Sequence, residues 1–175
     1  MKIEEYSINK NEQNMKLEDK IELPTVYTVK ILDDSFLRLK MERIFEELNQ
    51  KELAKFALSN AKRFLDYFDD ELKDDKRILE AEEMFNKYLK DEISSIDMRK
   101  ASLVANKLDK ESKTEIGKHA ARSFAQAIGS THMRANAIAS TDNMIRVINL
   151  IHENDIEAAT NERKKQLELL NEMTK

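Results

Sequence analysis

The chain has 175 residues, a formal net charge of −4, two glycines, one proline and no cysteine. So few turn-forming residues argue against all-β and α/β folds, and the missing cysteines exclude disulfides, thiolate metal sites and cysteine nucleophiles. Apolar residues recur with a period near 3.6, so we predict an all-α, single-domain bundle of six to seven helices with an extended N-terminal arm.

The arm comprises residues 1–33 and the helical bundle domain residues 34–175. Within the arm, Ile21–Leu32 is rich in β-branched residues, but Pro24 disfavours a strand. We expect this segment to lie extended over the bundle; the alternative is strand pairing with a second subunit, which would make the protein a homodimer. The chain shows neither a signal peptide nor an apolar run of about 18 residues, so we expect a cytoplasmic protein.

Four amphipathic helices are predicted before residue 110. We expect them to start at Asp34, at Lys51, at Asp75 and after a cap provided by Ser94, Ser95 or Asp97. The apolar spacing of the fourth helix predicts that its buried face consists of Met98, Ala101, Val104, Ala105 and Leu108.

The following stretch, Lys118–Ile151, contains most of the small residues at helical spacing, and we expect it to lie near the centre of the bundle. We predict a helix over 113–139, a kink or restart at Ser140–Asp142, another apolar helix, and an outer helix over Asp155–Met173. Residues spaced by four form two neighbouring rows on the central helix. The first row consists mainly of small residues: Ala121, Ala125, Gly129 and Met133. The second row ends in two polar residues: Phe124, Ile128, His132 and Asn136. The small row should allow another helix to approach closely.

No motif in the sequence predicts a cofactor or a metal ion. A phosphate loop needs several clustered glycines, and neither Glu-x-x-His nor His-Glu-x-x-His occurs. We expect His132 to be hydrogen-bonded inside the bundle, together with Asn136 or a facing polar group, and His119 to be solvated. The interspersed charges argue against nucleic-acid and membrane binding, and the acidic balance favours a basic partner.

Four segments resemble a bacterial family of immunity proteins that belong to polymorphic toxin systems. The segments are LAKFALSNAKRFLDYF (53–68), DDKRILEAEEMFNKYLKDEI (74–93), MRKASLVAN (98–106) and ARSFAQAIGSTHMRANAIAS (121–140). The resemblance implies a protein that binds a cognate toxin through its surface, with no catalytic residues of its own. It marks His132, Asn136 and Arg77 as signature polar residues, although Asn136 stands where the family often has a second histidine.

Two other functions are compatible with the sequence. The first is an enzyme of unknown type that uses a polar pocket around His132 and Asn136. The second is an oligomeric helical scaffold or regulatory protein. A toxin gene beside the gene for this chain would favour the immunity protein, whereas a ligand bound beside His132 would favour the enzyme.

Overall fold

The computed structural model describes residues 25–175, and within that range the chain forms seven α-helices and one short 3₁₀ helix, η2 (Leu65–Tyr67). The α-helices are α2 (Ser35–Glu47), α3 (Gln50–Lys62), α4 (Lys76–Leu89), α5 (Ser95–Glu111), α6 (Glu115–Gly129), α7 (Ala135–Ile151) and α8 (Ile156–Met173). The described residues contain no β-strand. The predicted all-α bundle is therefore confirmed.

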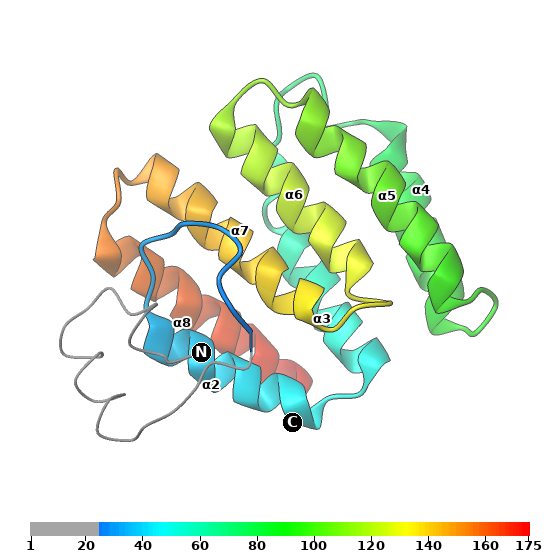
Figure 1. Cartoon of the computed structure of the whole chain (residues 1–175), viewed down its shortest axis with the longest axis horizontal. Coiled ribbons are helices and arrows are strands. Elements are labelled where there is room, and N and C mark those ends of the chain that lie inside the picture. Colours follow the sequence, from blue (N-terminus) through cyan, green and yellow to red (C-terminus); the bar gives the residue numbers. More distant parts are fainter. Residues whose placement is uncertain (1–24) are drawn as a thin grey trace.

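Helices α6 and α7 occupy the middle of the bundle (Figure 1). Helix α6 packs against α3, α5 and α7, and α7 packs against α3 and α8. Helices α4 and α5 form one flank of the molecule, while α2 and α8 form the other. The stretch Lys118–Ile151, which was expected to lie near the centre of the bundle, therefore does so.

Polar residues just before most helices fix where those helices begin. The side chains of Asp34, Asn49, Asp75, Ser94, Thr114 and Asp155 each accept a hydrogen bond from a backbone N–H in the first turn of the helix that follows. Such caps satisfy donors that have no partner within the helix. The predicted starts at Asp34, Asp75 and Ser94 are confirmed.

The predicted central helix over 113–139 is wrong, because α6 ends at Gly129 and α7 starts at Ala135. The hydroxyls of Ser130 and Thr131 donate to the carbonyls of Ala127 and Ile128, at 2.6 and 2.7 Å, where the first helix ends. The expected kink at residues 140–142 is also absent. Ser140 there donates to the carbonyl of Ser123 in α6, so its polar group is satisfied inside α7.

The small residues of α6 do allow close helix packing, as predicted. Ala125 and Gly129 are buried, and the Ser102 hydroxyl of α5 donates to the carbonyl of Ala125. A Cβ added to Gly129 would lie 2.9 Å from the Ser102 Oγ, which is closer than packed atoms tolerate. Met133, expected in the same row, instead follows the end of α6 and is 54% exposed.

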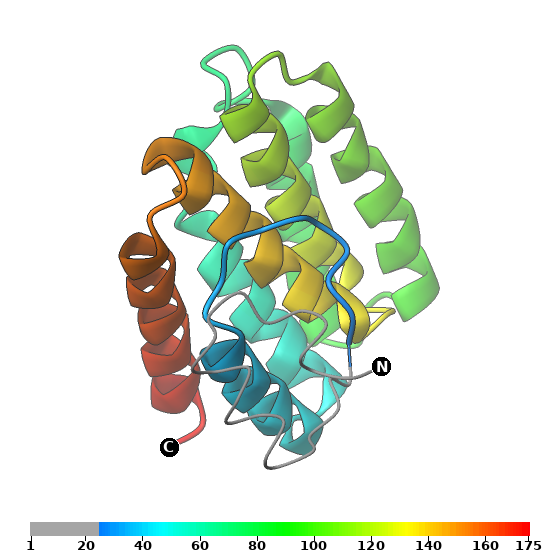
Figure 2. The same ribbon diagram turned by 60° about the vertical axis from the view of Figure 1, so that its left-hand side comes forward.

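The described part of the N-terminal arm crosses α7 as an arch without helix or strand (Figure 2). Ile31 packs against Ile145 and Ala159. The Leu32 backbone N–H donates to Asn149 Oδ1 at 2.8 Å, and Asn149 Nδ2 donates back to the Leu32 carbonyl at 2.9 Å. The amide side chain therefore pairs with the arm much as a neighbouring strand would. Residues 1–24 of the predicted arm lie outside the described part of the chain.

Candidate functional site

The three signature residues named by the sequence do not form one site. His132 lies in the connection between α6 and α7, and Asn136 lies in the first turn of α7. The expectation that they share one face of a single helix is wrong, because that helix ends at Gly129. Arg77 is in the first turn of α4, at the far end of the α4–α5 pair.

Arg77 joins the start of α4 to the end of α5. Its guanidinium donates to Asp75 Oδ1 at 2.8 Å and to Glu111 Oε1 at 2.9 Å. The hydrogen bonds from Arg77 lower the pKa of Asp75 to about 2. The pKa of His132, by contrast, is lowered by burial and further by the positive charge of Arg99, near the start of α5. Residues 99 and 111 of α5 are separated by roughly 18 Å along the helix axis.

His132 is half-buried, and its Nδ1 has no hydrogen-bond partner within residues 25–175. The predicted bond to a facing polar group is therefore wrong. His119 was expected to be solvated, and this is also wrong, because the residue is only 7% exposed. Its Nδ1 lies 2.9 Å from Asn143 Oδ1. Because that amide oxygen accepts, Nδ1 carries the proton. Burial lowers the pKa of His119, so the ring is neutral near pH 7.

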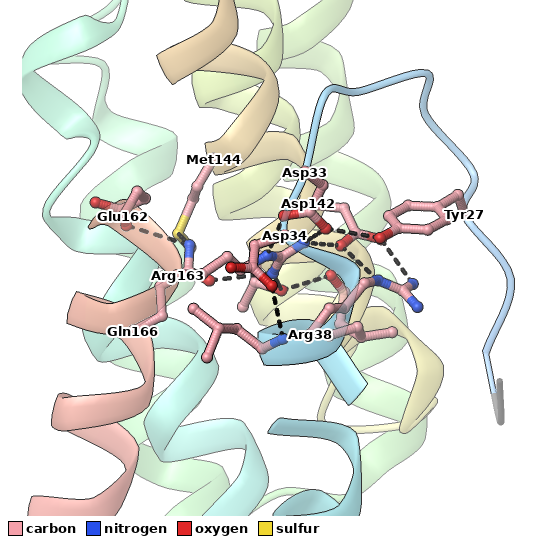
Figure 3. A network of polar contacts seen from close by, with 12 residues as sticks. Tyr27, Asp33, Asp34, Arg38, Asp142, Met144, Glu162, Arg163 and Gln166 are labelled. Carbon is pink, nitrogen blue, oxygen red and sulfur yellow. Dashed lines mark hydrogen bonds and ion pairs between the residues drawn. The ribbon is translucent and has the colours of Figure 1, made fainter. Parts of the chain in front are cut away.

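A buried charge cluster joins four segments of the chain (Figure 3). It consists of Asp33 from the arm, Arg38 from α2, Asp142 from α7 and Arg163 from α8, all of them 0% exposed. Asp142 accepts from Arg38 Nε at 2.9 Å and from Arg163 Nη2 at 2.6 Å. Arg163 also binds Asp33 through two hydrogen bonds of 2.8 Å. Two carboxylates thus neutralise two guanidinium groups.

The surroundings of the cluster stabilise its charged forms. Burial opposes ionisation of Asp33, but the charge and hydrogen bonds of Arg163, with a bond from Tyr27, hold the pKa of Asp33 below its usual range. The Tyr27 hydroxyl donates to Asp33 Oδ2 at 2.7 Å, and Arg38 Nη1 donates to the carbonyl of Thr25 at 2.8 Å. The arm is therefore tied to the bundle by ionic and neutral hydrogen bonds.

The cluster is suited to holding the fold together rather than to chemistry. Its carboxylates are engaged by guanidinium groups, and none of its four charged side chains reaches solvent. The cluster was not predicted from the sequence, in which Asp142 was interpreted as part of a kink or restart. The available signal was periodicity, because Arg38 and Arg163 interrupt the apolar faces of their helices, with Met41 and Leu170 among their neighbours.

Glu42 lies beside the cluster on α2, with one carboxylate oxygen 3.5 Å from Arg38 Nη1. Burial raises its pKa from 4.5 to about 7, and the charge of Arg38 opposes that shift. In the folded protein, Glu42 therefore keeps its proton over a pH range in which the unfolded chain has released it. The stability of the fold is thereby linked to pH.

We expect wild-type stability to fall as pH rises from about 5 to 8, relative to Glu42→Gln. Between the two pKa values the folded state binds more protons than the unfolded state, so raising the pH favours unfolding. The difference in unfolding free energy between the two proteins should change by about 1–3 kcal/mol across this window. Urea denaturation of both proteins at pH 5 and pH 8 measures this change. A difference in unfolding free energy that stays constant would contradict the raised pKa of Glu42.

The outward face of α5 carries exposed apolar side chains among cations. Residues at successive spacings of four and three lie on one side of a helix, and here they form what we term the α5 stripe: Ile96, Lys100, Leu103, Lys107 and Lys110. Ile96 is 69% exposed and Leu103 is 59% exposed. Val104, predicted to be buried, flanks the stripe and is 40% exposed. This face is the candidate interaction surface.

None of the helices in the described part of the chain is both long and apolar enough to cross a membrane. Those residues also contain no group of three or more metal-ligating side chains with suitable geometry. A family model described as Imm-5 like putative immunity protein matches residues 43–173, from within α2 to the last residue of α8. Neither a curated protein nor a solved structure matches the chain.

Proposed function

Because the chain belongs to the family of Imm-5 like putative immunity proteins, we propose that it binds and neutralises a cognate toxin. The toxin would belong to a bacterial polymorphic toxin system, and neutralisation would take place in the cytoplasm of the cell that makes both proteins. Inhibition would rest on a complementary surface, with no catalytic step by this chain. The family match carries this proposal, since it covers nearly the whole bundle.

The construction of the bundle supports a binding role. Each of the two flanks is held to the central helices by buried contacts, and the charge cluster fixes α2, α7, α8 and the arm to one another. A surface that is already rigid loses little conformational entropy when it binds, and this favours tight complexes. Exposed apolar side chains on α5 would supply contact area to such a complex.

Inhibition without catalysis also agrees with where the polar residues lie. Arg77 and His132 are at opposite ends of α5, and Arg77 is engaged by two carboxylates. The buried charge cluster has no path to solvent through its own side chains. Blocking access to the toxin's active site, or holding it in an inactive conformation, requires only binding.

Co-expression tests the proposal. The experiment first identifies a toxin domain in the genes that neighbour the gene for this chain. That domain should arrest growth when produced alone and should be harmless when this chain is produced with it. The purified proteins should form a stoichiometric complex in light scattering after size-exclusion chromatography. The His132→Ala variant should protect equally well, because binding does not use an imidazole.

Two results would contradict the proposal. One is failure of the wild-type chain to protect against, or to bind, that toxin domain. The other is a covalent change in the toxin, seen by intact-mass spectrometry after incubation with wild type and lost with His132→Ala. That second result would assign an enzymatic activity to the region around His132.

A further inference from the structure

We infer that the α5 stripe is the docking surface for the toxin and that the toxin presents an acidic surface with an apolar centre to it. This inference rests on the proposed function and specifies the partner's chemistry. It reverses the expectation from net charge, which favoured a basic partner. The reversal comes from the way the charges of α5 are paired in three dimensions.

Each acidic residue of α5 has a hydrogen-bond or ion-pair partner within the protein. Asp97 accepts from the backbone N–H and hydroxyl of Ser94 at the helix start. Asp109 pairs with Arg122 of α6 at 2.8 Å, and Glu111 pairs with Arg77 of α4. These three residues are all the acidic residues of the helix. Two of these acids still act on the stripe: after the bonds from Ser94 and Arg77, the charges of Lys100 and Lys107 add to the lowering of the pKa of Asp97 and of Glu111, respectively.

The basic residues of the same helix outnumber its acids and form no ion pairs within the described range. Arg99, Lys100, Lys107 and Lys110 are all exposed, and none forms an ion pair with another residue of the described range 25–175. A chain of net charge −4 thus presents, along one helix, four exposed cations without ion-pair partners in the described range. Such a local field attracts an acidic surface and speeds its association, even when the whole molecule is acidic.

Apolar groups are interleaved with these cations. Ile96 and Leu103 alternate with the lysines, and Val104 adjoins a shallow groove of about 150 Å³ between α4 and α5. The groove is also lined by Ala81, Met84 and Ala101, and by one acidic and two basic residues: Glu80, Arg77 and Lys100. A pocket of this size accommodates one large apolar side chain, the kind of anchor that dominates protein–protein binding energy.

This combination favours a protein partner over a nucleic acid. A phosphate backbone would use the four cations but would leave the exposed isoleucine and leucine without contacts. A protein surface with carboxylates around an aromatic or aliphatic anchor engages both kinds of group. The other flank offers a groove of about 830 Å³ between α2, α3 and α8, whose charged lining residues are Glu47, Glu52, Lys55 and Lys175. Acids and bases are equal in number there, so that groove has no excess of cations like that of the α5 stripe.

The test compares two double charge reversals in the full-length chain. Lys100→Glu with Lys107→Glu inverts the α5 stripe, while Lys164→Glu with Lys165→Glu makes the same change on the exposed face of α8. Binding is measured by surface plasmon resonance against a catalytically inactivated form of the toxin domain that the co-expression experiment identifies. Thermal melting checks that both variants fold as the wild type does.

The α5 reversal should raise Kd by about 100-fold or more, with a large fall in the association rate, whereas the α8 reversal should change Kd by less than about threefold. Leu103→Ala should raise Kd about tenfold, mainly through faster dissociation. For wild type, the association rate should fall as sodium chloride is increased, because salt screens the attraction.

Several outcomes would overturn the inference. If wild type binds and the α5 reversal binds equally well, the proposed function stands but the docking surface or its charge is wrong. Tight binding of a labelled single-stranded RNA at about 150 mM salt, abolished by the α5 reversal, would assign the stripe to nucleic acid. A dimer of this chain that dissociates on α5 reversal would assign it to self-association. If wild type does not bind the toxin at all, the proposed function itself fails.

Discussion

Asp142→Ala is expected to lower the free energy of unfolding by about 3–5 kcal/mol. The carboxylate of Asp142 accepts from Arg38 and from Arg163, and all three side chains are fully buried. Removing it leaves two fully buried guanidinium groups facing one remaining cluster carboxylate, Asp33. An uncompensated buried charge costs much more than the loss of a surface ion pair.

Urea denaturation followed by circular dichroism measures this effect. Glu168→Ala on the exposed side of α8 is the control, and it should change the unfolding free energy by less than about 0.5 kcal/mol. If Asp142→Ala does not fold, Asp142→Asn keeps an acceptor oxygen and should give a measurable, smaller loss. An Asp142→Ala midpoint equal to that of wild type would mean that the buried charge cluster does not hold the bundle together.

Ala125→Leu is expected to destabilise the bundle by about 1–3 kcal/mol. Ala125 is fully buried, and its carbonyl accepts from the Ser102 hydroxyl of α5. The larger side chain has no free volume between α6 and its neighbours, so α5 must move away from α6. That movement would lengthen the bond from Ser102 and open the packing around Gly129.

The matched control is Ala135→Leu, at the exposed start of α7. It makes the same change in volume at a position open to solvent, so its unfolding free energy should stay within about 0.5 kcal/mol of wild type. Both variants can be compared by thermal and urea denaturation. Equal stability of Ala125→Leu and wild type would show that the α5–α6 contact tolerates added volume and that the small residues are not required there.

The buried charge cluster and the α5 stripe divide the charged residues into two roles. In the cluster, arginines are paired inside the protein, where they fix the positions of the arm and three helices. On α5, basic residues are left without partners within the described range because the nearby acids pair elsewhere. The first group sets the shape of the molecule, and the second is available to another molecule.

The sequence alone was sufficient for the fold class and for most helix starts. Apolar periodicity and capping residues are local properties, since a helix buries one face of its own segment and a cap serves the first turn that follows it. Asp34, Asp75 and Ser94 could therefore be assigned from their neighbours in the chain. The family resemblance also rested on local patterns, in four separate segments of the chain, and the family match confirms it.

Only the tertiary structure decided where α6 ends, which histidine is buried and which charges stay unpaired. Ser130 and Ser140 look equivalent as helix breakers, yet the hydroxyl of Ser140 finds the Ser123 carbonyl of the neighbouring helix and leaves α7 unbroken. Asp142 pairs with Arg38, 104 positions away in the chain. Polar and charged groups choose partners by distance in space, and burial makes that choice energetically decisive, so their roles become visible only once the helices are packed.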